Sequence, residues 1–307
     1  MKPILLAAAL TGLVAACDAA HLPDPVGETM STMLGHEDVR IMPRTEPDAV
    51  IAYGDAPMQM GELRLPDGDG PFPIAVVIHG GCWTRAIGAT QEYMAPLAAA
   101  LTAEGIATWN VSYRQLGDEG AGWPGTFLDW GRAVDHVRIL AQDYPLDLDR
   151  VSVFGHSAGA HAALFAAARH RLPQDSEIRD GDPLRVQAAV AIDGPGDLAR
   201  GRDAAAAICG TDGIAGVMGG LPDEQPGRYA QGSPVALLPS GVRQLVVASV
   251  IMPHGQGADY AAAVRANGDD VTLIAMENAG HFNMIAPGTS SWDEVMPVYL
   301  QFARMQP

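Results

Sequence analysis

Short apolar segments alternate with helical patterns along most of this 307-residue chain, and this alternation constrains the fold more than any other feature. Residues 74–78 and 186–192 are almost entirely apolar, as expected for parallel strands that are covered by helices on both faces. Strand–helix–strand units form right-handed crossovers, which bring successive strands into one sheet. The sequence therefore predicts an α/β fold in which a mostly parallel sheet is flanked by helices on both faces.

The expected elements can be placed along the chain. Strands are predicted at about 49–54, 61–65, 73–79, 106–113, 150–155, 186–192, 243–250 and 270–276. Helices are predicted at about 90–104, 126–142, 158–171, 256–267 and 290–303. No second series of this kind occurs, so residues 49–307 are expected to form a single domain. The Gly- and Pro-rich stretch at about 194–240 is too long for a simple loop, and we expect an insertion over the sheet edge that could form a lid.

The first residues have the pattern of a processed export signal. Lys2 precedes an apolar stretch at 4–14, and small residues then lead to Cys17. This segment resembles the lipobox of a bacterial lipoprotein, with residues 1–16 as signal peptide and Cys17 as the acylated first residue of the mature chain. Asp18 resembles the signal that retains such lipoproteins at the inner membrane in some Gram-negative bacteria. The alternative is an ordinary secretory signal in which the cysteine is accidental.

These patterns predict an exported protein that faces the periplasm and contacts the membrane only through a lipid anchor on Cys17. Residues 17–48 are polar and contain several prolines, so they are expected to form a tether and N-terminal extension. The mature chain then contains Cys82 and Cys209, which in an oxidising compartment either pair with each other or remain free, buried thiols.

Composition excludes two classes of protein. Acidic residues outnumber basic ones by 36 to 19, which gives a formal net charge of −17 and argues against nucleic-acid binding. Hydrophobic residues make up 48% of the chain, which is ample for a large core and argues against a disordered protein. The expected partner is therefore a small molecule.

A Gly-His-Ser-Ala-Gly string at 155–159 follows a predicted strand and leads into an Ala-rich helix. This context is typical of a nucleophile elbow, in which the flanking glycines permit a tight, strained turn that exposes the serine hydroxyl. Ser157 is the predicted nucleophile, and the N–H of Ala158, at the positive end of the helix, is placed to stabilise a developing oxyanion. The alternative is that Ser157 is a plain turn serine.

Two further segments match this chemistry. The strand at 74–78 ends in His-Gly-Gly-Cys-Trp at 79–83, where paired glycines let backbone N–H groups approach a substrate oxygen. We expect His79 to be structural, and Trp83 either to line the substrate pocket or simply to pack. A Gly-bounded loop after the last strand carries His281, which is the candidate general base, with His254 as fallback. His156 and His161 are expected to pack against the elbow or to tune it.

Taken in order, these motifs resemble the α/β-hydrolase superfamily. The chain is similar to its esterase and kynurenine-formamidase-like group with an HGGxW oxyanion loop, from about residue 60 to the C-terminus. The motifs that carry the resemblance are HGGCW, NVSYR at 110–114, GWPGT at 122–126, GHSAG, and GHF at 280–282.

The resemblance implies a serine hydrolase without cofactor or metal, acting on small esters or aryl formamides. It also implies that Ser157 is the nucleophile, that His281 is the base, and that the N–H groups of Gly81, Cys82 and Ala158 form the oxyanion hole. Trp83 and Trp123, which lie in two of the shared motifs, are the candidate substrate-binding residues.

The catalytic acid departs from the family pattern. The loop at 249–255, where the family places an aspartate, contains no carboxylate. Asp193, at the end of the preceding strand, is the candidate acid, because some α/β-hydrolases take it from that position. Asp259 is the fallback, and Asp197 resembles a structural position. The same pattern also fits a Ser–His dyad or a degraded site.

The sequence therefore predicts a serine hydrolase that cleaves small carboxylic esters through an acyl-enzyme intermediate. Two alternatives remain: a kynurenine-formamidase-like aryl-formamide hydrolase, or a non-catalytic binding protein on a hydrolase scaffold. The missing acid motivates the second.

Overall fold

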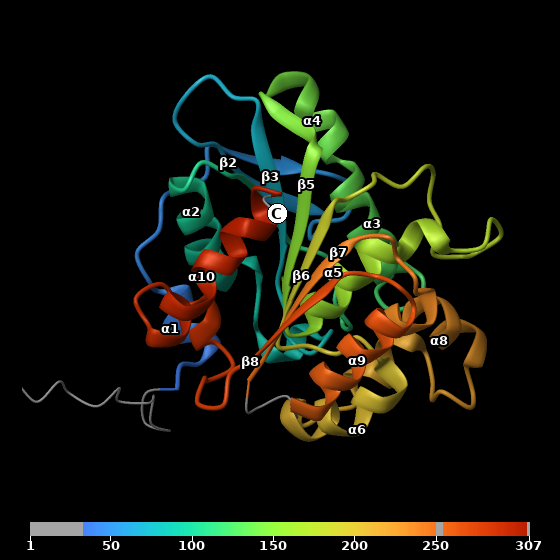
Figure 1. The fold of residues 1–307 in the computed structure, drawn as a ribbon. Coiled ribbons are helices and arrows are strands. Elements are labelled where there is room, and N and C mark those ends of the chain that lie inside the picture. Colours follow the sequence, from blue (N-terminus) through green and yellow to red (C-terminus); the bar gives the residue numbers. More distant parts are fainter. Residues whose placement is uncertain (1–32, 250–253, 306–307) are drawn as a thin grey trace, which may run out of the picture.

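A single eight-stranded sheet forms the centre of the molecule, with strand order β1-β2-β4-β3-β5-β6-β7-β8 (Figure 1). The computed structural model describes residues 33–249 and 254–305, so the predicted signal peptide and Cys17 lie outside the described residues. β1 and β2 pair antiparallel at one edge, and every pairing from β4 through β8 is parallel. The predicted mostly parallel α/β architecture is confirmed.

The strands lie close to the expected positions. They are β1 (Ala49–Ala52), β2 (Met60–Arg64), β3 (Phe72–Ile78), β4 (Ala107–Val111), β5 (Leu146–His156), β6 (Ala188–Ile192), β7 (Arg243–Ala248) and β8 (Val271–Ala275). The helices are α1 (His36–Arg40), α2 (Ala95–Ala103), α3 (Gly125–Asp135), α4 (Val137–Asp143), α5 (Ala158–Ala168), α6 (Leu198–Cys209), α7 (Gly213–Met218), α8 (Pro226–Gly232), α9 (His254–Ala266) and α10 (Ser290–Ala303). No helix within the described ranges is long and apolar enough to cross a membrane.

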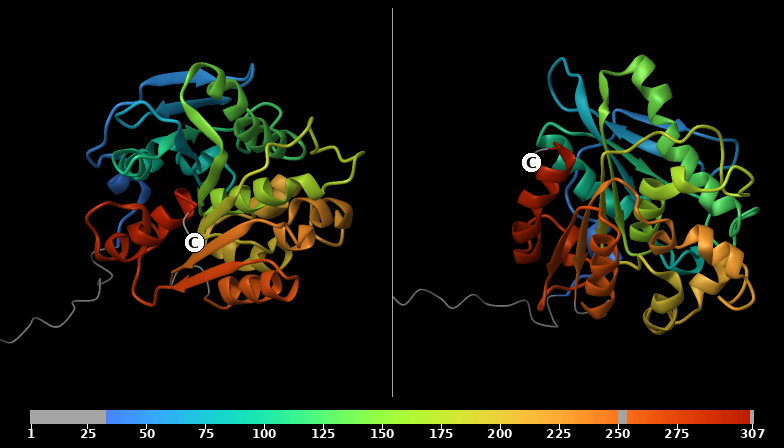
Figure 2. Two further views of the ribbon diagram at one scale, coloured as in Figure 1. Left: turned by 45° about the horizontal axis from the view of Figure 1, so that its top comes forward. Right: turned by 45° about the vertical axis from the view of Figure 1, so that its right-hand side comes forward.

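Helices cover both faces of the sheet, and each face has its own apolar core. Alternation along β3 sends Val76 to one core and Val77 to the other. Figure 2 shows α2 and α10 on one side of the sheet and α3, α5 and α9 on the other. Because both faces are covered, the central strands are apolar at nearly every position, which is the pattern that made them recognisable in the sequence.

The Ala-rich helix α5 is buried along its whole length. A helix that is apolar all round has no solvent face, and its small side chains let its backbone lie close to the strands below. This burial fixes the start of α5 relative to the end of β5, and Ser157 lies between the two elements.

The segment at 194–240 is mostly helical and contains α6, α7 and α8. α6 begins just beyond the carboxyl end of β6. Residues of α6 and α9 line a small cavity there, together with the segment that joins β6 to α6. Ile214 and Val217 on α7 are buried in one of the two cores. The insertion is therefore packed onto the domain, at the edge of the sheet where the parallel strands end.

Residues 33–48, which belong to the predicted extension, also contact the domain. Val39 on α1 is fully buried, and the backbone N–H of Leu34 donates to Oδ1 of Asn283 at 2.9 Å. The described part of the extension thus packs against the segment that leads into α10.

A buried ion pair anchors the loop that follows β4. Asp129 on α3 accepts from the backbone N–H of Arg114 at 3.0 Å, and from Nε and a terminal nitrogen of the same guanidinium at 2.8 and 2.6 Å. Gln59 donates to the same carboxylate at 2.6 Å. The hydrogen bond with Asp129 raises the pKa of Arg114 above its ordinary value.

Replacing Asp129 with alanine should lower the free energy of unfolding by about 3–5 kcal/mol, because it leaves the largely buried Arg114 without its partner. Urea unfolding followed by circular dichroism measures the change. Asp180→Ala is the matched control: it removes an exposed pair with Arg132 and should cost at most about 1 kcal/mol. Equal losses in the two variants would show that burial does not make the Asp129 pair more important than an exposed one.

Candidate active site

The predicted site residues gather where parallel strands end. Ser157 follows β5, Asp193 follows β6, and the loop that carries His281 follows β8, while the glycine loop begins directly after β3. Because the carboxyl ends of parallel strands share one edge, the topology collects these distant segments at one edge of the sheet.

Ser157 occupies a strained turn between β5 and α5. Its φ of 58° lies in the left-handed region, which is unfavourable for a residue with a side chain. The surrounding backbone enforces this conformation, since the N–H of Ser157 donates to the carbonyl of Ile192 at 2.8 Å. The side chain is half-buried at the start of α5.

The glycines of the elbow are required by packing. A Cβ on Gly155 would overlap the carbonyl of Gly159, and a Cβ on Gly159 would overlap the carbonyl of Ile78 on β3. Backbone atoms block both positions and cannot swing aside as a flexible side chain could. The G-x-S-x-G pattern therefore reflects how closely strand, turn and helix approach one another here.

Asp193 and His281 form a buried pair at this edge of the sheet. The Oδ2 atom of Asp193 lies 2.5 Å from Nδ1 of His281, and Asp193 is only 2% exposed. Ser249 also donates to the carboxylate, from its backbone N–H at 2.9 Å and from its hydroxyl at 2.6 Å. Three donors thus fix the carboxylate, and the carboxylate in turn orients the imidazole so that Nε2 is left for other chemistry.

Asp193 shares with Ser157 an unusual backbone conformation, with a φ of 51°. Its N–H donates to the carbonyl of Val247 on the adjacent strand at 2.7 Å. Non-glycine residues adopt such conformations where the surrounding structure enforces them, and they concentrate at functional sites.

His156, directly before Ser157, connects the base to the glycine loop. Its Nε2 lies 2.8 Å from the carbonyl oxygen of His281, and its Nδ1 lies 3.1 Å from the hydroxyl of Tyr93. Tyr93 in turn accepts the N–H of Gly80. The carbonyl requires Nε2 of His156 to be the donor, so Nδ1 accepts from Tyr93. Burial lowers the pKa of His156 well below its usual value, with a smaller contribution from His281, so this residue remains neutral.

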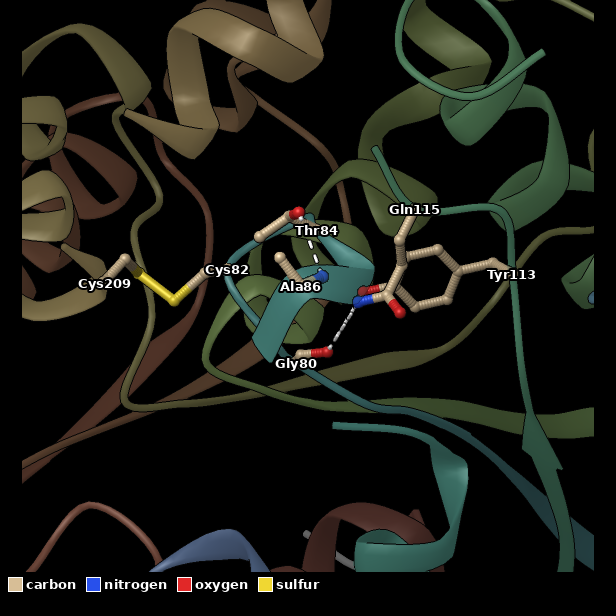
Figure 3. The surroundings of a disulfide bond; sticks show 7 residues. All are labelled: Gly80, Cys82, Thr84, Ala86, Tyr113, Gln115 and Cys209. Carbon is tan, nitrogen blue, oxygen red and sulfur yellow. Dashed lines mark hydrogen bonds between the residues drawn. A yellow bond between two sulfur atoms is a disulfide. The ribbon is translucent and has the colours of Figure 1, made fainter. Parts of the chain in front are cut away.

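Hydrogen bonds to carbonyls orient the N–H groups of the glycine loop. The carbonyl of Gly80 lies 2.7 Å from Nδ1 of His79. It also accepts from Nε2 of Gln115 at 3.4 Å (Figure 3). The carbonyl of Gly81 accepts from the N–H of Thr84 at 3.0 Å. In a trans peptide the C=O and the following N–H point in opposite directions. Fixing these two carbonyls therefore fixes the directions of the Gly81 and Cys82 N–H groups.

The loop lies directly against the elbow. A Cβ on Gly80 would come within 2.7 Å of Cβ of Ser157. Within the described residues, the backbone N–H groups of Gly81, Cys82 and Ala158 donate to no protein acceptor. Backbone donors that have no protein acceptor and lie next to a serine suit the stabilisation of a tetrahedral oxyanion.

Other predicted residues lie elsewhere. Asp259, the fallback acid, is 55% exposed on α9 and pairs with Arg200 at 3.0 Å, so the structure does not bring it to His281. Asp197 caps the start of α6 by accepting the N–H groups of Ala199 and Arg200. The side chain of His254, the fallback base, lies outside the described residues.

The two tryptophans proposed for substrate binding make packing contacts. Trp83 is 2% exposed, and its Nε1 donates to Nδ1 of His161 at 3.2 Å, which favours a packing role. The half-buried Trp123 donates from Nε1 to Glu177 at 2.9 Å, and the Arg228 guanidinium lies over its ring. Burial lowers the pKa of His161 to about 4, so its imidazole is a neutral packing partner.

His79 is fully buried and structural, as expected. Its ring stacks on Tyr113, and burial lowers its pKa to about 4. The pairing of the two remaining cysteines is also settled: Cys82 in the glycine loop and Cys209 at the end of α6 form a disulfide. Among the residues described, no cluster of His, Cys, Asp or Glu side chains could hold a metal ion.

Sequence reasoning missed the supporting residues Ser249, Tyr93 and Gln115. Ser249 had a signal: it opens the loop in which the family places its aspartate, and a serine there can hydrogen-bond to an acid on the neighbouring strand. Tyr93 and Gln115 gave no comparable signal, because they reach the site only through the tertiary fold.

Comparisons with known proteins identify a family and relatives of this chain. The BD-FAE family matches residues 62–249, more than half of the chain. Among curated proteins of Mycobacterium tuberculosis, the probable carboxylic ester hydrolase LipM is 31% identical over 161 residues, which are 51% of this chain and 36% of LipM. Esterase LipQ is 27% identical over 214 residues, which are 68% of this chain and 50% of LipQ. The chain thus spans half or less of the length of these relatives.

Solved structures share the fold. A truncated carbohydrate esterase from gut microbiota is 20% identical with a TM-score of 0.70, covering 85% of this chain and all of that one. Esterase B from Lactobacillus rhamnosis is 17% identical with a TM-score of 0.71, covering 88% of this chain and 91% of that one. Both confirm the α/β-hydrolase architecture.

Proposed function

The chain belongs to the BD-FAE family, and from this membership and the site geometry we propose that it is a serine hydrolase that cleaves small carboxylic esters. One observation carries the proposal: the buried pair of Asp193 Oδ2 and His281 Nδ1, 2.5 Å apart, is hydrogen-bonded through the His281 carbonyl to His156, the residue before Ser157, and the glycine loop lies against the same elbow. The proposed nucleophile, base, acid and oxyanion donors thus meet at one edge of the sheet.

In the proposed reaction, His281 removes the proton from Oγ of Ser157 while that oxygen attacks the ester carbonyl carbon. The carbonyl oxygen becomes an oxyanion and accepts hydrogen bonds from Gly81, Cys82 and Ala158. The tetrahedral intermediate collapses, the alcohol leaves with the proton from His281, and an acyl-serine remains. The same imidazole then takes a proton from water while the water oxygen attacks the acyl carbonyl carbon. The second tetrahedral intermediate releases the carboxylic acid, and His281 returns its proton to Oγ of Ser157.

Asp193 stabilises the imidazolium that forms in each half-reaction. Its buried carboxylate lies against Nδ1, so it favours both the orientation and the charge that His281 needs after taking the proton. The apparent lack of an acid motivated the alternative of a non-catalytic binding protein, and the contact between Asp193 and His281 supports the hydrolase instead.

The names of the relatives support an ester as substrate. LipC and LipQ are esterases, and LipM is a probable carboxylic ester hydrolase. Aryl formamides would pass through the same tetrahedral chemistry, so they form the natural comparison substrate in an assay.

Ser157→Ala should abolish the burst of p-nitrophenol that the native protein releases from p-nitrophenyl acetate, because no acyl-enzyme can form. A fluorophosphonate probe should label the native protein at Ser157 and leave the variant unlabelled, which mass spectrometry of tryptic peptides measures. A native protein that neither releases a burst nor reacts with the probe would contradict the proposal.

Asp193→Asn should lower kcat by about 10³- to 10⁴-fold without unfolding the protein, because an amide cannot stabilise the imidazolium. Asp259→Asn is the matched control; it alters an exposed acid on α9 and should leave kcat unchanged. Steady-state kinetics together with thermal melts separate loss of chemistry from loss of structure. Near-native turnover in Asp193→Asn would show that this carboxylate is not the acid.

We further propose that the protein is exported and anchored by a lipid on Cys17, facing the periplasm and retained at the inner membrane through Asp18. The leader pattern around Lys2 and Cys17 supports this, and so does the Cys82–Cys209 disulfide, since such bonds persist in oxidising compartments. An acyl chain on Cys17 would join the membrane to the N-terminal extension.

Expressed at full length in a Gram-negative host, the native chain should incorporate a palmitate analogue and sediment with membranes. Cys17→Ala should do neither, because the acceptor thiol is gone. Membrane fractionation and labelling measure both. A Cys17→Ala chain that still sediments with membranes would defeat the lipid-anchor proposal.

A further inference from the structure

The oxyanion loop contains a turn that its own sequence does not favour. Residues 81–84 form a four-residue turn closed by the N–H of Thr84 on the carbonyl of Gly81. The two central residues, Cys82 and Trp83, have φ values of 54° and 59°. Positive φ at both central positions is the pattern of a type I′ turn, which strongly prefers Asn and Gly there.

Cys and Trp are poor residues for this conformation, since a Cβ makes the left-handed region unfavourable. Such conformations persist where tertiary contacts over-determine them. The turn also contains the peptide whose N–H belongs to Cys82, one of the proposed oxyanion donors. Whatever holds the turn in this conformation therefore holds a catalytic group in position.

Separate tertiary contacts fix the two central residues. Trp83 is buried and donates to His161, and its carbonyl accepts the N–H of Leu116 at 2.7 Å. Cys82 is bonded through its sulfur to Cys209, with the two Cα atoms 6.0 Å apart (Figure 3). Behind the turn, α7 approaches closely, because a Cβ on Gly213 would overlap the carbonyl of Cys82.

The disulfide also connects the oxyanion loop to the segment that follows the acid. Asp197, four residues after Asp193, caps α6, and α6 ends at Cys209. An ion pair at 2.8 Å between Arg202 and Asp212 joins α6 to the start of α7. The covalent path thus runs from the acid, along α6 and across the disulfide to the oxyanion donor.

We propose that Cys209 is a positioning residue for the hydrolytic reaction: through its disulfide it holds Cys82 in the left-handed conformation that directs the Cys82 N–H at the oxyanion. The inference rests on the proposed function and names a residue outside the catalytic motifs. Without the bond, Cys82 relaxes towards an ordinary conformation, and the peptide between Gly81 and Cys82 rotates away from the oxyanion.

Cys209→Ala should lower kcat for p-nitrophenyl acetate by about 10- to 100-fold. This loss is smaller than the loss caused by removing an oxyanion donor altogether, because the N–H of Cys82 is displaced and not absent. KM should change by less than about threefold. Dithiothreitol, which reduces the disulfide to two thiols and is itself oxidised to a cyclic disulfide, should lower kcat of the native protein to the same level. It should not affect the Cys209→Ala variant.

A pair of double variants separates positioning from general stabilisation. Neither Cys82→Ala/Cys209→Ala nor Cys82→Gly/Cys209→Ala has a disulfide, but glycine adopts positive φ without strain. The glycine variant should therefore have a kcat about fivefold or more above that of the alanine variant, although glycine adds no contact. Equal kcat values in these two variants would overturn the proposal.

Two controls separate a loss of folding from a loss of activity in these variants. All assays are made at a temperature at which circular dichroism shows native protein, and if Cys209→Ala does not fold, the reduced native protein replaces it. A native kcat in Cys209→Ala, with fluorophosphonate labelling intact, overturns the positioning role and leaves the proposed function in place. Failure of the native protein to react with the probe overturns the proposed function itself.

Discussion

The close contact between the Asp193 carboxylate and the imidazole of His281 is the interaction on which the site depends. It joins two loops that are 88 residues apart in sequence, and it is formed where β6 and the segment after β8 reach the same edge of the sheet. Burial makes the pair effective, because a carboxylate shielded from water acts on a neighbouring charge in a low dielectric. The elbow contacts the same loop through His156, which is hydrogen-bonded to the carbonyl of His281, and the glycine loop lies against the elbow.

Much of the architecture could be predicted because parallel strands covered on both faces leave an apolar signature. The buried strand β3 and the Gly-flanked Ser157 follow from local rules, since each is specified by contacts within a few residues or by the periodicity of one element. The insertion at 194–240 shows where local rules end. Its glycines and prolines concealed the helices, because the local Asp caps of α6 and α7 are weak signals without the burial of a few apolar residues against the rest of the domain.

The site was predictable to the extent that its chemistry is coded in short motifs. Asp193 could be named as the candidate acid, but its choice over Asp259 required the fold, because sequence cannot show which carboxylate faces an imidazole 88 residues away. The disulfide was equally undecided, since two cysteines in one chain do not reveal whether their Cα atoms lie within bonding range. Tyr93 and Gln115 were not foreseen, since they reach the site from separate segments and belong to no motif.

The position of His156 has a consequence for how such a site can change. One neutral imidazole is hydrogen-bonded through Tyr93 to the oxyanion loop and directly to the backbone of the base. The oxyanion loop and the loop that carries the base are therefore held by the same residue. A substitution of His156 or Tyr93 would disturb both loops, and the effects of the two substitutions would be strongly non-additive. Substrate preference can therefore change more easily through substitutions in the surrounding helices and loops, because their side chains take no part in the hydrogen bonds of His156 and Tyr93.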